Sequence, residues 1–120
     1  MTKQLTTVDL RRILKNYSGF LGVYPINRVK YVNPPKHVEV SFIANLQADN
    51  LPGNHWVAVR RRNDNVAEYF DSYGRIPPLE IQHWLTRHSS RWSWNKRKVQ
   101  DINDKTACGY LCVKFVKKLL

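Results

Sequence analysis

Two short apolar segments joined by a four-residue turn place the tightest constraint on how this chain can fold. His55–Arg61 and Val66–Asp71 are rich in β-branched and aromatic side chains, and the connection Arg62-Asn-Asp-Asn65 is rich in turn-forming residues. This pattern predicts an antiparallel hairpin. Because the start of one strand then lies beside the end of the other, residues 55 and 71 are expected to be neighbours at one edge of the sheet.

The rest of the chain predicts helices before and after this hairpin and one more strand. Apolar residues recur at helical spacing behind Thr6 and Thr7, either of which can cap the helix, and Gly19 marks its end. Residues 20–35 contain several glycine and proline residues and are expected to be irregular. The other expected elements are a strand over 37–46, a helix over 79–88, a segment of ambiguous structure over 91–98 and a final helix over 105–120. Together they predict a single α+β domain, residues 1–120, with a central, mainly antiparallel sheet and flanking helices.

The chain is strongly basic, with 20 Lys and Arg residues against 9 Asp and Glu residues and a formal net charge of +11. A hydrophobic fraction of 42% and an aromatic fraction of 12% exclude a disordered basic tail. Charge of this size favours binding to polyanions such as nucleic acid, and the alternative is a solvated surface that keeps the protein soluble. The candidate polyanion-binding residues are Arg60, Arg61, Arg62, Arg97 and Lys98.

The two cysteines, Cys108 and Cys112, exclude a disulfide framework and fit a reducing compartment. A C-x-x-x-C spacing without a second pair is a poor zinc motif, so no metal site is expected. No apolar run approaches the roughly 20 residues needed to span a bilayer, and the N-terminus has no secretory core. We therefore expect a monomeric protein that is not secreted, has no membrane partner and is located inside the cell or inside a virion.

One set of residues points to nucleophilic catalysis. Cys108 falls at the start of the predicted final helix, where the positive end of the helix dipole favours a thiolate. His55 could pair with that thiolate and later protonate a leaving amine, and Asp71 could fix the orientation of the imidazole ring. The side-chain amide of Gln100 could donate to an oxyanion if the intervening loop folds back.

Each of these residue types also has an ordinary structural interpretation. A buried cysteine is most often a small apolar side chain, and an aspartate at the end of a strand is often a turn residue. Cys112 is expected to pack in the core, with a redox pair between Cys108 and Cys112 as the minority alternative. No role is expected for His37, His83 or His88, which lack comparable partners.

Three segments, in order along the chain, resemble those of a known family. They are Pro52-Gly-Asn-His-Trp-Val-Ala-Val59, Tyr69-Phe-Asp-Ser-Tyr-Gly74 and the stretch from Val99 to Cys112 with its Thr-Ala-Cys-Gly-Tyr-Leu-Cys ending. Together they resemble the adenovirus-type cysteine proteases, the adenain family, which is related to the SUMO-specific proteases. Upstream, Gly19-Phe-Leu-Gly-Val-Tyr24 is similar to the N-terminal segment of adenain.

The resemblance implies an adenain-like fold with the nucleophilic cysteine at the N-terminus of a helix. His55 matches the catalytic base and acid of the family, and Asp71 matches the acidic residue that orients it. Gln100 matches the glutamine of the oxyanion hole, and Cys108 matches the nucleophile. Trp56 matches the tryptophan that follows the family's histidine, and we weigh a substrate-channel wall equally against plain core packing.

We therefore expect a cysteine endopeptidase that cleaves precursor proteins of viruses or virus-like elements after small residues such as glycine. Two alternatives stay open: an isopeptidase acting on ubiquitin-like conjugates, and a catalytically degenerate basic domain that binds nucleic acid. The sequence requires no cofactor, and the resemblance implies DNA as an activating polyanion. The expected partners are thus a protein substrate and nucleic acid, in the host nucleus or virion if the protein is viral.

Overall fold

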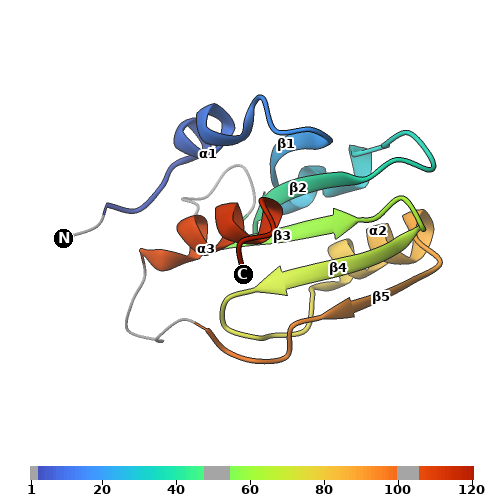
Figure 1. The fold of residues 1–120 in the computed structure, drawn as a ribbon. Helices are drawn as coiled ribbons and strands as arrows, with labels where there is room; N and C mark the ends of the chain where they lie inside the picture. Colours follow the sequence, from blue (N-terminus) through green and yellow to red (C-terminus); the bar gives the residue numbers. More distant parts are fainter. Residues whose placement is uncertain (1–2, 48–54, 100–105) are drawn as a thin grey trace.

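A five-stranded mixed sheet forms the centre of the protein (Figure 1). The computed structural model describes residues 3–47, 55–99 and 106–120. The strands follow one another across the sheet in chain order, β1-β2-β3-β4-β5. Their bounds are β1 Phe20–Pro25, β2 Val40–Asn45, β3 Trp56–Arg61, β4 Val66–Asp71 and β5 Arg91–Trp94. The helices are α1 Thr7–Leu14, the 3-10 helix η1 Ile26–Tyr31, α2 Leu79–His88 and α3 Ala107–Val116. The predicted α+β class is confirmed.

The predicted hairpin forms the middle of the sheet. Strands β3 and β4 pair antiparallel, with Val57 opposite Asp71 at one end and Arg61 opposite Ala67 at the other. The turn between them is closed by the backbone bond from the Asn65 N–H to the Arg62 carbonyl, at 2.9 Å. Asn65 adopts a φ of 70°, a conformation that asparagine accepts more readily than most residues. Because β2 also pairs antiparallel with β3, the central three strands form the antiparallel sheet that the sequence predicts.

The two outer strands differ from the prediction, because both pair in parallel with their neighbours. The expectation that residues 20–35 are irregular was wrong, since this range holds β1 and η1. The glycine and the proline within β1 are tolerated because this strand lies at the edge of the sheet. Gly22, with a φ of 145°, falls where the register between β1 and β2 shifts, and Pro25 is the last residue of the strand. The ambiguous segment 91–98 begins as the other edge strand, β5.

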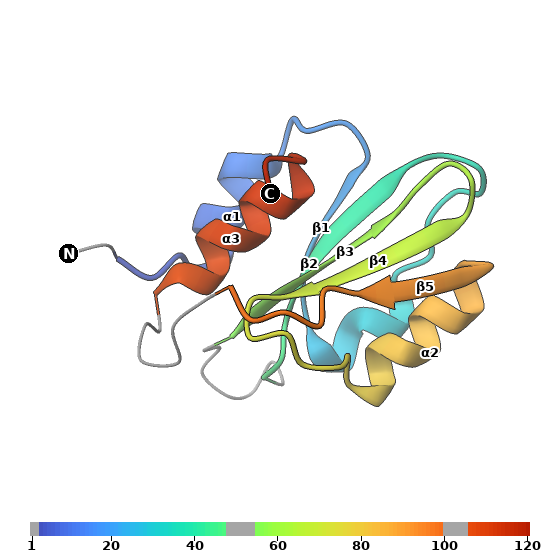
Figure 2. The same ribbon diagram turned by 60° about the horizontal axis from the view of Figure 1, so that its bottom comes forward.

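Helices cover both faces of the sheet (Figure 2). Helices α1 and α3 pack side by side on one face, over a core that includes Leu10, Ile43, Phe70 and Val116. On the other face, α2 and η1 cover a second core. This second core includes Phe42, Val57, Tyr69, Ile81 and Trp84. Successive residues of a strand point to opposite faces, so the nearly continuous burial of β2 and β3 follows from this two-sided cover.

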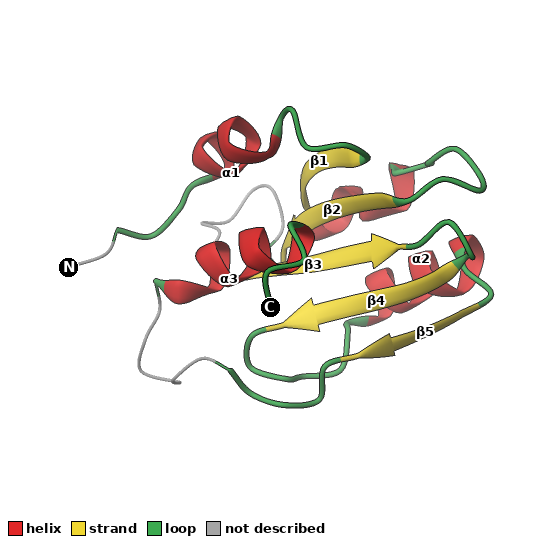
Figure 3. Cartoon of the chain, viewed as in Figure 1, coloured by secondary structure: helices red, strands yellow, loops and turns green. Residues whose placement is uncertain are grey.

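The helix ends follow local chemistry. Thr6 caps α1, accepting from the Asp9 N–H at 3.1 Å, while the Asp9 carboxylate accepts from the Thr6 N–H at 3.0 Å. This reciprocal pair is a capping box. Helix α2 has the predicted bounds, whereas α3 ends at Val116, short of the predicted residue 120 (Figure 3). Among the described residues, no helix is both long and apolar enough to cross a membrane.

Candidate active site

The hairpin brings His55 and Asp71 into contact, as the sequence predicts. His55 immediately precedes β3, and Asp71 is the last residue of β4. The His55 Nε2 atom lies 2.8 Å from Asp71 Oδ1, and both side chains are buried. The same Oδ1 atom accepts a hydrogen bond from the Tyr73 backbone N–H at 2.8 Å. The carboxylate therefore holds the imidazole ring by one edge and leaves its second nitrogen, Nδ1, for another partner.

Cys108 is that partner. It is the second residue of α3, and its side chain is 1% exposed. Packing of α3 against β3 and β4 brings the start of the helix to the end of the sheet where His55 lies. The His55 ring and the Cys108 thiol form a hydrogen bond. The imidazole, the carboxylate and the thiol therefore lie together at one end of the sheet.

The interactions at this site favour the charged forms of both His55 and Cys108. Burial lowers the pKa of His55, but the hydrogen bonds and charges of Asp71 and Cys108 outweigh burial and raise that pKa to about 9. Burial raises the pKa of Cys108, but the His55 ring and the backbone N–H groups of Trp56 and Gly109 outweigh burial and lower it. Both shifts favour an imidazolium paired with a thiolate, which is the form in which a cysteine reacts as a nucleophile.

An aromatic ring that the sequence analysis did not single out covers the imidazole. Tyr73 stacks on His55 with ring centroids 4.8 Å apart and an interplanar angle of 22°. The Arg75 guanidinium lies over the Tyr73 ring, 4.9 Å from its centroid. The only signal in the sequence was the position of Tyr73, two residues after Asp71 in the segment that resembles the adenain family.

Asn95 was also missed, although it fixes the backbone of Asp71. Its side-chain Oδ1 accepts from the Asp71 N–H at 3.0 Å, and its Nδ2 donates to the Asp71 carbonyl at 2.7 Å. The amide thus continues the sheet beyond Trp94, the last residue of β5, by one side chain. An asparagine directly after a strand is common in turns, so the sequence offered no specific signal.

Trp56 lies next to the site but is packed into the core. Its side chain is 3% exposed, and the indole N–H donates to the Leu5 carbonyl at 3.1 Å. Gly109, the residue after Cys108, lies so close that an added Cβ would meet Leu5 Cβ at 3.1 Å and Trp56 Cδ1 at 3.3 Å. Trp56 also contributes to a cavity of about 260 Å³ with Asn45 and the segment around Leu5. The contacts favour the packing role, and the substrate-wall role stays a prediction.

The other candidate positions are placed as follows. Gln100 lies outside the described residues, so its predicted part in an oxyanion hole stays a prediction. Cys112, on α3, is fully buried in the core between the sheet and helices α1 and α3. This burial raises the pKa of its thiol well above the ordinary value. That placement fits the expected packing role. Within the described ranges, no cluster of three or more His, Cys, Asp and Glu side chains could hold a metal ion.

Arg61 does not fit the predicted polyanion-binding surface. Its side chain is 2% exposed, and its guanidinium donates to the backbone carbonyls of Pro35, Val38 and His88. Alternation along β3 explains this, because Arg61 points to the face of the sheet that α2 and η1 cover. The run of three arginines is therefore not one basic cluster in space.

Arg60 and Arg62 each have a carboxylate partner. Arg60 stacks its guanidinium 4.1 Å from the centroid of the Phe115 ring and lies 3.4 Å from Glu68. Arg62 forms an ion pair with Asp64 at 2.9 Å. The positive charges of Arg60 and Arg62 are thus partly neutralised by carboxylates of the protein itself. The two remaining candidates, residues 97 and 98, are exposed.

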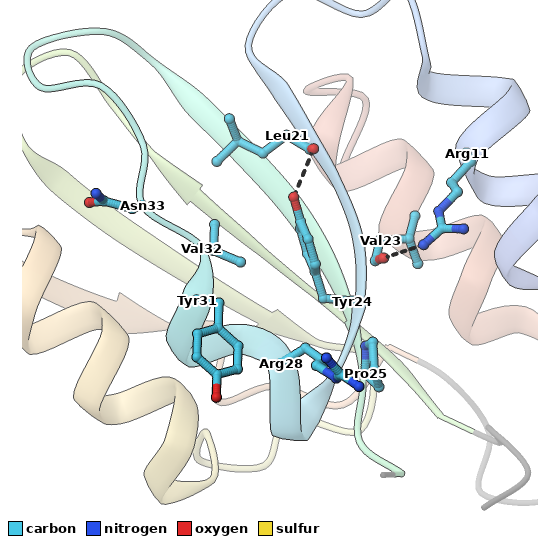
Figure 4. Close-up of a pocket in the computed structure, with 9 residues that line it drawn as sticks. All are labelled: Arg11, Leu21, Val23, Tyr24, Pro25, Arg28, Tyr31, Val32 and Asn33. Atoms are coloured by element: carbon cyan, nitrogen blue, oxygen red, sulfur yellow. Dashed lines mark hydrogen bonds between the residues drawn. The ribbon is translucent and has the colours of Figure 1, made fainter. Parts of the chain in front are cut away.

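A cavity of about 610 Å³ opens beside β1 (Figure 4). Its walls include Arg11, Tyr24, Arg28 and Tyr31. Arg11 donates to the Val23 carbonyl at 3.1 Å, as the figure shows. Neither the imidazole nor the thiol of the candidate site contributes to its lining, so it is not the site of the chemistry inferred above.

Comparison with solved structures places the fold. Two crystal structures of the ASFV pS273R protease superimpose with TM-scores of 0.71 and 0.72, at 19% and 17% sequence identity. The chain has the fold of this protease. The matches cover 98% of this chain but only 58% and 57% of the pS273R chains, so the protein spans less than two thirds of their length. The central domain of the uncharacterized Lpg1148 protein from Legionella pneumophila matches with a TM-score of 0.58 at 14% identity, over 97% of this chain and 76% of that one.

At 19% and 17% identity, this likeness to the ASFV pS273R protease is one of fold. At the sequence level, no protein family and no curated protein matches the chain.

Proposed function

We propose that the protein is a cysteine endopeptidase in which Cys108 is the nucleophile. One observation carries the proposal: a thiol at the start of a helix, an imidazole and a carboxylate lie in one hydrogen-bonded line, with His55 bonded to Asp71 at 2.8 Å. The fold agrees, because the ASFV pS273R protease has the same architecture.

In the first half of the reaction, the Cys108 thiolate attacks the carbonyl carbon of the scissile peptide bond and forms a tetrahedral intermediate. His55, as imidazolium, donates the proton on Nδ1 to the amide nitrogen. The carbon–nitrogen bond then breaks, the amine product leaves, and an acyl thioester remains on Cys108.

In the second half, a water molecule attacks the thioester while His55, now neutral, takes a proton from it. The carbon–sulfur bond breaks, the carboxylic acid product leaves, and the imidazolium–thiolate pair is restored. Throughout the cycle, Asp71 keeps the ring oriented and stabilises its positive charge.

The negative charge on the tetrahedral oxygen needs hydrogen-bond donors. The backbone N–H of Cys108 belongs to the first turn of α3, where N–H groups have no partner within the helix. We assign the second donor to the side-chain amide of Gln100, by its resemblance to the family's glutamine. Together with the positive end of the helix dipole, these donors would stabilise the oxyanion.

The substrate part of the proposal comes from the resemblance to the adenain family. We propose cleavage after small residues such as glycine, in precursor proteins of a virus or a virus-like element. The same chemistry would cleave an isopeptide bond to a ubiquitin-like protein. Digestion of a peptide library in parallel with a ubiquitin-like conjugate, both analysed by mass spectrometry, separates the two substrates.

The test of the activity is turnover of the cleaved peptide by Cys108→Ala and His55→Ala variants. Each is expected to lose turnover by about a thousandfold or more. Cys112→Ala is the matched control, because it removes the other thiol and should retain activity if the protein stays folded. Wild-type turnover in both site variants would refute the proposal.

We further propose that DNA raises the activity, since the net charge is +11 and residues 97 and 98 expose their cationic side chains. The measurement is peptide turnover with and without duplex DNA over a range of salt concentrations. Stimulation should fade as salt rises, and equal turnover at every salt concentration would contradict it.

A further inference from the structure

A second concave site lies at the opposite end of the sheet from His55 and Cys108. It is a pocket of about 470 Å³ between the turn before β2, the end of β3 and the end of α2. Five of its nine lining residues carry cationic or imidazole side chains: Lys36, His37, Arg61, Arg87 and His88. The other four are uncharged, so no carboxylate lines the pocket.

At the base of this pocket, Arg61 is a buried cation that has no carboxylate partner among the described residues. Its guanidinium donates to three backbone carbonyls, and its Nε atom has no partner among the described residues. Burying a charge without a counterion is costly, and dipoles of carbonyl groups offset only part of that cost. An anion in the pocket would supply the missing counter-charge.

The nearest carboxylates are directed elsewhere. Glu39 follows the turn that contributes Lys36 but forms an ion pair with Lys118 at 2.8 Å. Asp64, in the hairpin turn, is paired with Arg62. Glu80, in the first turn of α2, lines a neighbouring cavity together with Arg87 and His88 but does not line this pocket. Among the described residues, the pocket therefore has no carboxylate in its own lining to offset its positive charge.

The pKa of His88 is lowered in part by this positive charge. Burial lowers its pKa, and the charges of Arg61 and Arg87 lower it further. Its backbone carbonyl also accepts from Arg61 at 3.3 Å, which places the two residues in contact. A histidine surrounded in this way should gain a proton more readily once an anion enters.

We propose that this pocket binds a phosphate dianion, either as inorganic phosphate or as a phosphate monoester on a peptide. Several cationic groups from three separate elements converge there, which suits a tetrahedral oxyanion better than a planar carboxylate. The volume lies within the range of ordinary ligand sites and leaves space for the group that carries the phosphate. The site is roughly 17 Å from the catalytic end, because Arg61 and Trp56 lie five residues apart on β3.

The site is independent of the proposed protease activity, and its test does not measure turnover. The histidine ring signals of the whole chain are followed by NMR during titration with inorganic phosphate, with chloride keeping the ionic strength constant. We expect saturable shifts of the His88 and His37 signals and an upward shift of the pKa of His88. His55 serves as the internal reference, because it precedes β3 at the opposite end of the sheet and does not line this pocket.

Two variants and a matched control test the assignment. Lys36→Gln and Arg87→Gln change exposed side chains, and each should weaken phosphate binding about tenfold by removing one charge-assisted contact. Lys15→Gln removes the same charge from an exposed position at the end of α1 and should leave binding within about twofold.

A phosphoserine peptide, its unphosphorylated form and inorganic phosphate identify the source of the ligand. Tighter binding of the phosphopeptide assigns the site to phosphate monoesters, and tighter binding of inorganic phosphate assigns it to the free ion. Absence of saturable shifts, or equal weakening by Lys36→Gln and Lys15→Gln, would overturn the proposal.

Discussion

Replacing Asp71 with asparagine tests the electrostatic part of the site most directly. Asparagine has nearly the same shape and can still accept the hydrogen bond from His55 Nε2, so the variant removes the negative charge while preserving the contact. The pKa of His55 is raised from 6.5 to about 9, which corresponds to about 3 kcal/mol in favour of the imidazolium. The carboxylate and the Cys108 thiolate share this stabilisation, so loss of the Asp71 charge should lower the pKa of His55 by at least about one unit.

The direction of the change in pH dependence follows from these shifts. The imidazolium of the wild-type protein is present below pH 9 and is lost as the pH rises through about 9. In Asp71→Asn, the ring loses its proton at a lower pH, and the thiol loses the positive partner that lowers its pKa. The pH at which Cys108 is half ionised should therefore move upward, toward the ordinary value for a cysteine.

The assay is the rate of iodoacetamide labelling of Cys108 between pH 5 and pH 10, measured by mass spectrometry. The buried Cys112 provides the background rate in the same molecule. Asp64→Asn is the matched control, because it removes one carboxylate at the exposed hairpin turn and should leave the profile unchanged. Superimposable profiles for the wild type and Asp71→Asn would refute our account of how the thiol is activated.

Two further predictions concern positions outside the triad. Asn95→Ala removes both side-chain hydrogen bonds to the backbone of Asp71, so kcat should fall about tenfold with little change in KM. The pKa of His55, followed by NMR, should also change. An unchanged kcat would contradict a positioning role for Asn95. Gly19→Ala should destabilise the fold by about 3 kcal/mol or more in a denaturant titration, because Gly19 has a φ of 80° and an added Cβ would lie 2.3 Å from the Glu39 carbonyl oxygen. A loss below about 1 kcal/mol would show that the backbone relaxes at this position.

The parts of the structure that the sequence predicted are those that local patterns determine. The hairpin and the helix at 79–88 depend on short-range alternation, turn residues and helical spacing, and both lie where expected. The contact between His55 and Asp71 followed from the hairpin alone, since antiparallel pairing fixes which strand ends meet. For Cys108, the expectation needed the resemblance to a known family, because no local pattern indicates where α3 docks.

The parts that were missed depend on contacts between segments far apart in the chain. Strand β1 contains a glycine and ends in proline, and only its edge position in the finished sheet makes both acceptable. Arg61 was expected on the surface because its neighbours are arginines, yet α2 and the turn before β2 bury it. Asn95 and Tyr73 each reach the site from a loop, and no local sequence pattern indicates where the side chain of a loop residue points.

The division of the site between two structural layers has a consequence for how the protein could be switched off. The sheet supplies the base and its carboxylate, whereas a helix of ten residues supplies the sulfur. A helix that short has little stability by itself and depends on its packing against the strands. We expect gentle heating to detach α3 before the sheet unfolds. The reactivity of the Cys108 thiol should then be lost while amide hydrogen exchange in β3 and β4 stays slow. Loss of thiol reactivity and of amide protection at the same temperature would exclude this stepwise inactivation.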